Sequence, residues 1–151
     1  MVQRLQTVRR RQRGGALAEF AVVLPCLMLL MLLMGEGASV IDTYQVLQNA
    51  AREGARLAVT PGEQNLAGEV QTRVINYAAS DGIALTSADV TVNQGLTVSQ
   101  SGGGCSVAEP CLSASQVTVN YNYPLQYLPK LPFGIANTVK LGAAVEMRNF
   151  Y

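Results

Sequence analysis

A single carboxylate lies at the start of the most apolar stretch of this 151-residue chain. Glu19 directly precedes Phe20–Met34, a run of 15 residues without a charged side chain. A carboxylate at the edge of a membrane helix costs free energy, less near the interface than at the centre, and is a functional-site candidate for that reason. Glu19 and Phe20 are therefore the first residues to which the sequence assigns a role.

The spacing between Glu19 and a glycine pair predicts that this chain is cut by a peptidase. Gly14 and Gly15 end a leader, residues 1–14, that holds five arginines and no acid. A cut between the two glycines makes Glu19 the fifth residue of the mature chain and Phe20 the sixth. This layout is typical of a type IV prepilin signal, so Gly14 and Gly15 are the predicted processing site.

The distribution of charge predicts the orientation of the chain in a membrane. The net charge is only +1, but residues 15–151 carry six bases and ten acids, so that 6 − 10 = −4. Basic residues that flank an apolar span stay on the cytoplasmic side. We therefore expect the N-terminus to lie in the cytoplasm and the C-terminal part of the chain to lie outside it. The arginine cluster could instead bind nucleic acid, but the apolar run beside it argues against that partner.

The length of the apolar run is close to what a single membrane span needs. Residues 16–34 number 19, and about 20 are required. Glu36 follows, but weakly apolar neighbours extend the span, and we place the transmembrane half at about 16–38. The span is adequate if Glu19 lies near the cytoplasmic interface or is neutralised. Pro25 is expected to kink the helix, which membrane helices tolerate.

Helical periodicity continues beyond the predicted span, to about residue 60. One apolar stripe follows three- and four-residue steps, and small side chains crowd its far end. Either the stripe packs on the chain's own domain, or it packs between subunits. The stripe comprises Val40, Tyr44, Leu47, Ala51, Ala55 and Ala58, and Ala50 and Gly54 add to the small side chains.

A second amphipathic helix is predicted after a proline. Thr60 fits the N-cap, Pro61 the first helical position and Glu63 the acid of a capping box. Gly82 is the expected C-terminal stop. The apolar stripe of this helix comprises Leu66, Val70, Val74 and Tyr77.

The apolar period then changes to two, which indicates half-buried strands of an antiparallel sheet. Gly95 predicts a turn or a bulge. The fold class is therefore α+β, with the two helices covering the apolar face of a small sheet. The alternating segments are Val90–Val92 continuing to Val98, Val117–Pro124, and Thr138–Met147.

The three cysteines indicate the compartment. Cys105 and Cys111 lie in a glycine-rich loop, and a disulfide between them suits an extracytoplasmic domain. A zinc site needs about four ligands, so two thiols alone argue against a metal. Cys26, within the apolar run, is expected to be a small buried apolar residue.

Nothing in the sequence favours catalysis. Histidine is absent, which removes the commonest general base and metal ligand. The serines and acids form no recognisable nucleophile–base set. We therefore expect no enzyme activity, no catalytic residue, no metal and no cofactor.

Two segments together resemble the TadE-like pseudopilins, the minor pilins of tight-adherence (Tad/Flp) pili. The first is Arg-Gly-Gly-Ala-Leu-Ala-Glu-Phe, residues 13–20, followed by an apolar run with an early proline. The second and more specific one is Gln-Asn-Ala-Ala-Arg-Glu-Gly-Ala-Arg-Leu-Ala-Val, residues 48–59. Val117–Pro124 also looks like that family's strand before a prolyl turn. The resemblance covers the first 60 residues well and the remainder loosely.

The resemblance implies a structural role in assembly of the pilus and its secretion machinery. It implies cleavage between Gly14 and Gly15 by a prepilin peptidase, with Glu19 as the assembly acid. Other pilins, platform proteins and the membrane are the implied partners. The expected organisation is a leader (1–14), an N-terminal helix (15–60) and an extracytoplasmic α+β domain (61–151).

Two other interpretations remain open. Gly35-Glu36-Gly37 before Ala38 is an acceptable site for an ordinary signal peptidase, which would release a periplasmic or secreted binding protein. Alternatively, the span stays uncleaved as a signal anchor. Glu19 at the start of the run and the continuous stripe beyond Ile41 argue against an ordinary signal peptide.

Overall fold

The computed structural model describes residues 2–61, 66–99, 111–126 and 137–149, and side chains from residue 15 onward. The chain forms α1 (Val2–Ala58), α2 (Ala67–Ser80), a short 3₁₀ turn, η1 (Ser87–Asp89), and three strands. The strands are β1 (Val90–Val98), β2 (Leu112–Pro124) and β3 (Thr138–Arg148). The α+β class predicted from the sequence is confirmed.

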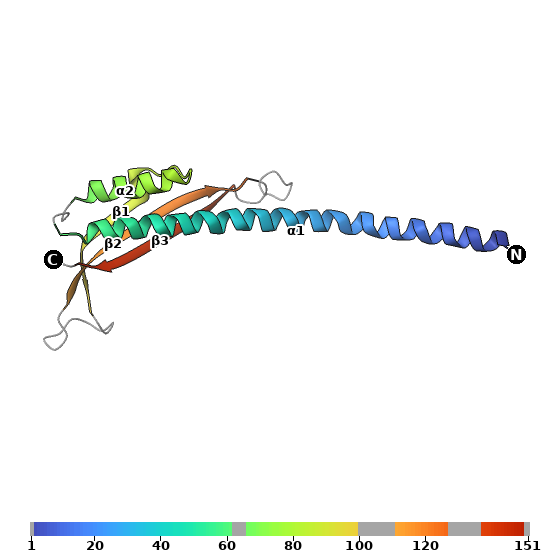
Figure 1. The fold of residues 1–151 in the computed structure, drawn as a ribbon, viewed down its shortest axis with the longest axis horizontal. Coiled ribbons are helices and arrows are strands. Elements are labelled where there is room, and N and C mark those ends of the chain that lie inside the picture. Colours follow the sequence, from blue (N-terminus) through green and yellow to red (C-terminus); the bar gives the residue numbers. More distant parts are fainter. Residues whose placement is uncertain (1, 62–65, 100–110, 127–136, 150–151) are drawn as a thin grey trace.

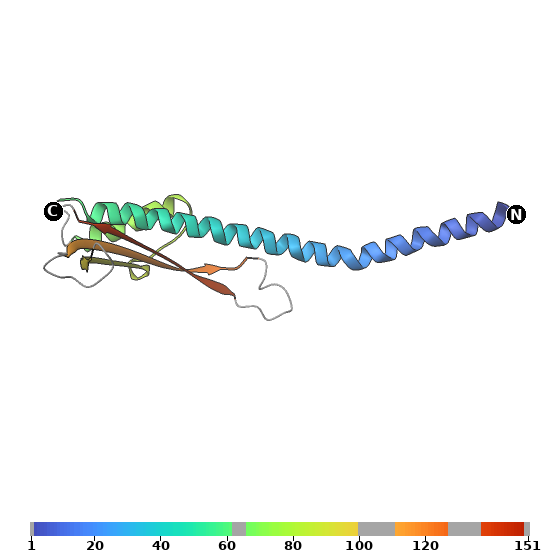
Figure 2. The same cartoon turned by 90° about the horizontal axis from the view of Figure 1, so that it is seen from below.

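The first helix dominates the shape of the molecule. α1 has 57 residues and is about 85 Å long at 1.5 Å per residue. Its C-terminal half lies over the sheet beside α2, whereas its N-terminal half projects away from the domain (Figure 1). The helix bends in its blue part, which contains Pro25, and continues beyond the bend (Figure 2). A proline removes one backbone hydrogen bond and explains a bend without a break.

The three strands form one antiparallel sheet in the order β1-β2-β3. Val117 in the middle strand pairs with Val92 on one side and Val145 on the other. The register shifts between Asn93 and Leu96, where Gln94 and Gly95 together face Ser115. Gly95 therefore lies in a β-bulge, one of the two structures expected there.

The middle strand begins earlier than predicted. β2 starts at Leu112, five residues before Val117, where the apolar alternation begins. Leu112 and Ser113 lie opposite Val98 and Thr97 of β1, and Ala114 lies opposite both Leu96 and Arg148. Pairing with the neighbouring strands, rather than local alternation, determines this strand end.

The core lies between the sheet and the two helices. α1 packs on β2 and β3, and α2 packs on β1, so both helices cover the same face, as expected. The small residues at the C-terminal end of the α1 stripe are fully buried within the chain. Of the two alternatives, packing of the stripe on its own domain is therefore the correct one. Tyr44 is an exception, because its side chain is exposed. The buried small residues are Ala50, Ala51, Ala55 and Ala58.

Gly54 is a point of close approach between the two helices. A Cβ atom placed there would overlap Cγ2 of Val74, and it would lie 3.5 Å from the side chains of Val70 and Val117. The glycine thus lets α2 and the middle strand meet α1 at one point. A valine side chain in a packed core has little room to move away.

Replacing Gly54 with alanine is expected to destabilise the domain by about 1–2 kcal/mol. Overpacking costs about 1–3 kcal/mol, and the higher helix propensity of alanine recovers up to about 1 kcal/mol. Gly68→Ala in α2 is the matched control, because nothing lies within 4 Å of a Cβ at that position. Denaturant unfolding of the detergent-solubilised protein measures both changes. Equal stability of the two variants would contradict the close packing at Gly54.

The predicted start of the second helix is wrong. α2 begins at Ala67, and the hydroxyl of Thr60 donates a hydrogen bond of 3.0 Å to the carbonyl of Arg56. Thr60 therefore closes the end of α1 and does not cap α2, while Glu63 lies outside the described residues. Instead, the carbonyl of Leu66 accepts the first amide bonds of α2, from Glu69 and Val70, at 3.0 and 3.2 Å.

The predicted stop of the second helix is confirmed. Gly82 has a φ of +77°, a conformation that glycine adopts without strain. The amide of Ile83 donates to Ala78 and that of Gly82 to Ala79, each at 3.0 Å. These two bonds form a Schellman motif, which satisfies carbonyls at the helix end.

Candidate functional site: the projecting helix and its junctions with the domain

The predicted processing site and Glu19 lie on the projecting half of α1. Glu19 and Phe20 are both exposed, and nothing lies within 4 Å of a Cβ placed on Gly15. The backbone at Gly14 and Gly15 is helical. Each glycine costs about 1 kcal/mol relative to alanine in a helix interior, so this pair weakens α1 locally. The roles assigned to these four residues stay predictions.

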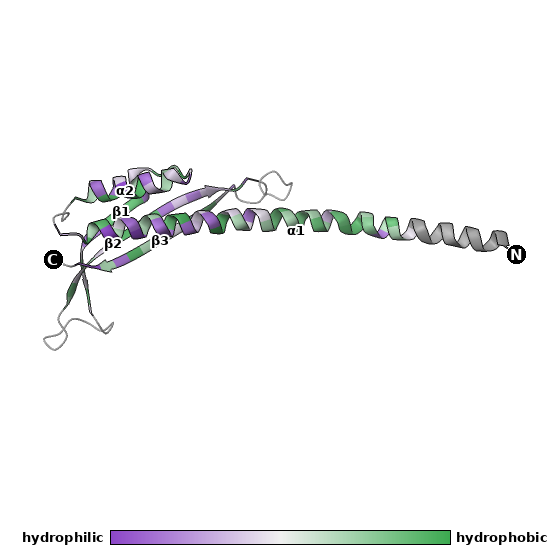
Figure 3. Ribbon diagram, in the orientation of Figure 1, coloured by the Kyte–Doolittle hydropathy of each residue, from purple (hydrophilic) through white to green (hydrophobic). Residues whose placement is uncertain are grey.

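The side chains that follow Glu19 form an unpartnered apolar surface. Among the described residues, α1 from Gly15 onward is the one helix long and apolar enough to cross a membrane. None of the residues in its most apolar stretch is buried within the molecule. Hydropathy colouring shows the apolar stretch of the projecting half as continuous green (Figure 3). The large exposed side chains there include Phe20, Val22, Leu27, Met28, Leu30, Met31, Leu33 and Met34.

Glu36 forms a junction between α1 and the domain that sequence analysis missed. Its side chain is only 2% exposed, and its Oε1 accepts a hydrogen bond of 2.8 Å from the backbone amide of Gln126. Next to it, the amide of Leu125 donates to the carbonyl of Asn137 at 3.0 Å. Glu36 therefore ties α1 to the connection between β2 and β3. One signal existed: Val40, four residues on and so on the same helix face, belongs to the apolar stripe.

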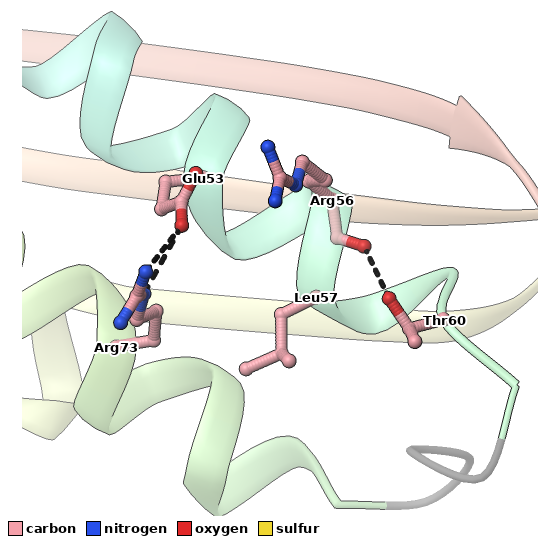
Figure 4. Close-up of a pocket in the computed structure, with 5 residues that line it drawn as sticks. All are labelled: Glu53, Arg56, Leu57, Thr60 and Arg73. Atoms are coloured by element: carbon pink, nitrogen blue, oxygen red, sulfur yellow. Dashed lines mark hydrogen bonds and ion pairs between the residues drawn. The ribbon is translucent and has the colours of Figure 1, made fainter.

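A second junction joins α1 to α2 at the other end of the domain. Arg73 donates to Oε1 of Glu53 through Nε at 3.2 Å and Nη2 at 2.6 Å (Figure 4). These residues line a hollow of about 280 Å³ together with Arg56, Leu57 and Thr60. The hydrogen bond from Arg73, with the charges of Arg73 and Arg56, holds the pKa of Glu53 below its ordinary value. The cluster links the two helices.

We expect the Glu53–Arg73 ion pair to contribute less than about 1 kcal/mol to the free energy of unfolding, because the side chain of Arg73 is 58% exposed. The pKa of Glu53 is lower in the folded state, so this contribution is present above the unfolded pKa. It is lost as the pH falls through the folded pKa, which lies below the ordinary value of 4.5. The stability gap between wild type and Glu53→Gln should therefore close in acid. Glu146→Gln, an exposed acid on β3, is the control, and thermal unfolding across pH measures both. A gap that stays constant down to pH 2 would contradict this assignment.

The cysteines divide into two groups. Cys26 is a free, exposed thiol on the projecting helix, so the expectation that it is buried within the chain is wrong. Cys105, the predicted disulfide partner of Cys111, lies outside the described residues. Their mutual pairing therefore stays a prediction. Within the described ranges, no group of three or more His, Cys, Asp or Glu side chains could hold a metal ion.

Comparison with known proteins identifies the N-terminal segment. Residues 14–56 match the family model described as TadE-like protein. The resemblance to TadE-like pseudopilins is thereby confirmed over this segment, which runs from the predicted processing site to the last turn of α1. It connects the chain to Tad pilus assembly and to a membrane. No curated protein and no solved structure matches the chain.

Proposed function

We propose, from the TadE-like segment at residues 14–56, that this protein is a minor pilin of a Tad pilus. A prepilin peptidase removes residues 1–14, and the mature chain acts structurally in assembly of the pilus and its secretion machinery. It has no enzymatic activity and requires no cofactor. Its partners are other pilins, the assembly platform and the membrane.

One observation carries this proposal: a single helix joins two different environments. The same 57-residue α1 has an exposed apolar half and a half buried in an α+β domain. A soluble binding protein gains nothing from displaying such a surface, and large exposed apolar patches mark contact with membranes or other proteins. A pilus subunit must stay anchored in the membrane before assembly. Afterwards its helix must pack against other subunits.

The proposed orientation follows from charge. The arginine-rich leader remains in the cytoplasm, because basic flanks are retained there. The α+β domain then lies in the periplasm, where the predicted Cys105–Cys111 disulfide is chemically favoured. The chain crosses the bacterial inner membrane once before it joins the pilus or its base.

The buried carboxyl group of Glu36 argues against the ordinary signal peptide. Cleavage before Ala38 would remove Glu36 and with it the hydrogen bond to Gln126. A binding protein released in this way would lose a contact that its own domain makes. The proposal that the chain keeps α1 intact from Gly15 onward retains that contact.

Deletion of the gene that encodes this protein, followed by complementation with the wild-type gene, tests the proposed function. Without it, Tad filaments should be lost, and the wild-type chain should restore them. A label on the complementing chain should then appear on sheared filaments or at their base. Wild-type numbers of filaments in the absence of the chain would refute a role in assembly.

A further inference from the structure

The apolar run between Glu19 and Glu36 is too short for a bilayer if both acids mark its ends. Phe20–Gly35, the stretch between the two acids, has 16 residues, about 24 Å of helix at 1.5 Å per residue. The hydrocarbon core of a bilayer is about 30 Å thick. A deficit of this size would have to be met by local thinning of the membrane.

This difference in length disappears if Glu36 does not mark the end of the lipid-facing surface, because its side chain is turned toward the domain. Glu36 is 2% exposed and is hydrogen bonded to Gln126, so its carboxyl group does not face the surroundings of the helix. The next charged residue is Asp42, which is exposed. The exposed face of α1 thus carries no charge from Phe20 to Ile41, 22 residues, or about 33 Å.

The one polar side chain that the added stretch contains besides Glu36, Ser39, is hydrogen bonded within the helix. Its hydroxyl donates to the carbonyl of Gly35 at 3.1 Å. Such bonds to the preceding turn let hydroxyl groups occupy membrane helices. Gly37 and Ala38 are exposed there without polar side chains, and Ile41 is 59% exposed.

We propose that lipid contacts the exposed face of α1 as far as Ile41, so that the domain is seated in the outer interface of the bilayer. The part that enters the interface is the end where Gln126 meets Glu36. This inference rests on the proposed single membrane span. The hydrogen bond at Glu36 has a function in this arrangement: it turns the carboxyl group toward the domain and leaves the lipid-facing surface of α1 uncharged as far as Ile41.

The alternative boundary, at Met34, differs by seven residues, or about 10 Å. In that case water would surround Ala38 and Ile41, and the domain would be held clear of the membrane. The two arrangements predict different surroundings for the same exposed side chains.

Spin labels on single cysteines distinguish the two boundaries. The full chain carries Cys26→Ala, which removes the free thiol, and is reconstituted into phosphatidylcholine vesicles. Labels replace Met31, Ala38, Ile41 and Gln45 in turn, all of them exposed. Collision with oxygen, which is concentrated in lipid, is compared with collision with a water-soluble nickel chelate. The oxygen-to-nickel ratio at Ala38 and Ile41 should equal that at Met31 within a factor of about two and exceed that at Gln45 several-fold.

The Met31 label separates failure of the inference from failure of the proposed function. If the label at Met31 is in lipid while those at Ala38 and Ile41 give the low ratio of Gln45, the chain spans the membrane. The proposal that the domain lies in the outer interface is then refuted. If the ratio at Met31 is also low, the chain does not cross the membrane through this run. That outcome overturns the single span and the inference together.

Discussion

Replacing Gly14 with leucine is expected to abolish processing and, with it, pilus assembly. A bulky side chain next to the scissile bond obstructs the peptidase. It also strengthens the helix at the place where α1 must open, since leucine has a far higher helix propensity than glycine. Immunoblots of the membrane fraction should show only the chain that retains its first 14 residues. The expected reduction in mature protein is complete, or nearly so.

Gly14→Ala is the graded control for this experiment. Its side chain is small, so partial processing should persist, although alanine also strengthens the helix. Filament counts should follow the amount of mature chain in the two variants. Normal processing of Gly14→Leu would show that the peptide bond after Gly14 is not the one that is cut.

The second large effect is expected at Glu19. Cleavage leaves a positively charged amine on Gly15, four residues from Glu19 in the same helix. In an assembled bundle, the amine of a neighbouring subunit could serve instead. Either pairing offsets the cost of a carboxylate in apolar surroundings, because an unpaired buried charge costs far more than a paired one. Glu19→Gln should therefore insert and largely be cleaved, yet fail to join other pilins, with filament numbers reduced about tenfold or more.

Co-purification with partner pilins and filament counts measure this effect. Glu146→Gln is the matched control, because it makes the same chemical change at an exposed position on β3. If Glu19 simply lies at the cytoplasmic interface in water, Glu19→Gln should assemble at wild-type levels. That result would remove the assembly role from Glu19 while leaving the processing site unaffected.

Local signals explain why much of the fold could be predicted from the sequence. Gly82 stops α2 because its backbone takes a positive φ, and Gly95 lies in a bulge; both follow from properties of glycine alone. Alternating apolar residues predicted the strands because one face of the sheet packs on helices. The fully buried small residues of α1 could not be assigned to internal packing in advance, since subunit packing uses the same residue types.

The features that sequence analysis missed depend on distant partners. The contact of Glu36 with Gln126 joins residues 90 positions apart, and nothing near Glu36 in the sequence names that partner. Thr60 was assigned to the N-cap of the second helix, but its hydroxyl donates to the carbonyl of Arg56 at the end of α1. The early start of β2 is accompanied by the buried bond from Ser115 to Asn149, at 2.7 Å. The expectation that Cys26 is buried was wrong, because this part of α1 projects away from the domain and its side chains are exposed.

Sequencing the N-terminus of the mature protein from the cell envelope is the most direct test of the central claim. The account predicts a chain that begins at Gly15, with the 14-residue leader absent and α1 otherwise intact. A start at Ala38 would contradict it, because an ordinary signal peptidase would then have removed both Glu19 and Glu36. A start at Met1 or Val2 would also contradict it, since the chain would then be an uncleaved signal-anchored protein.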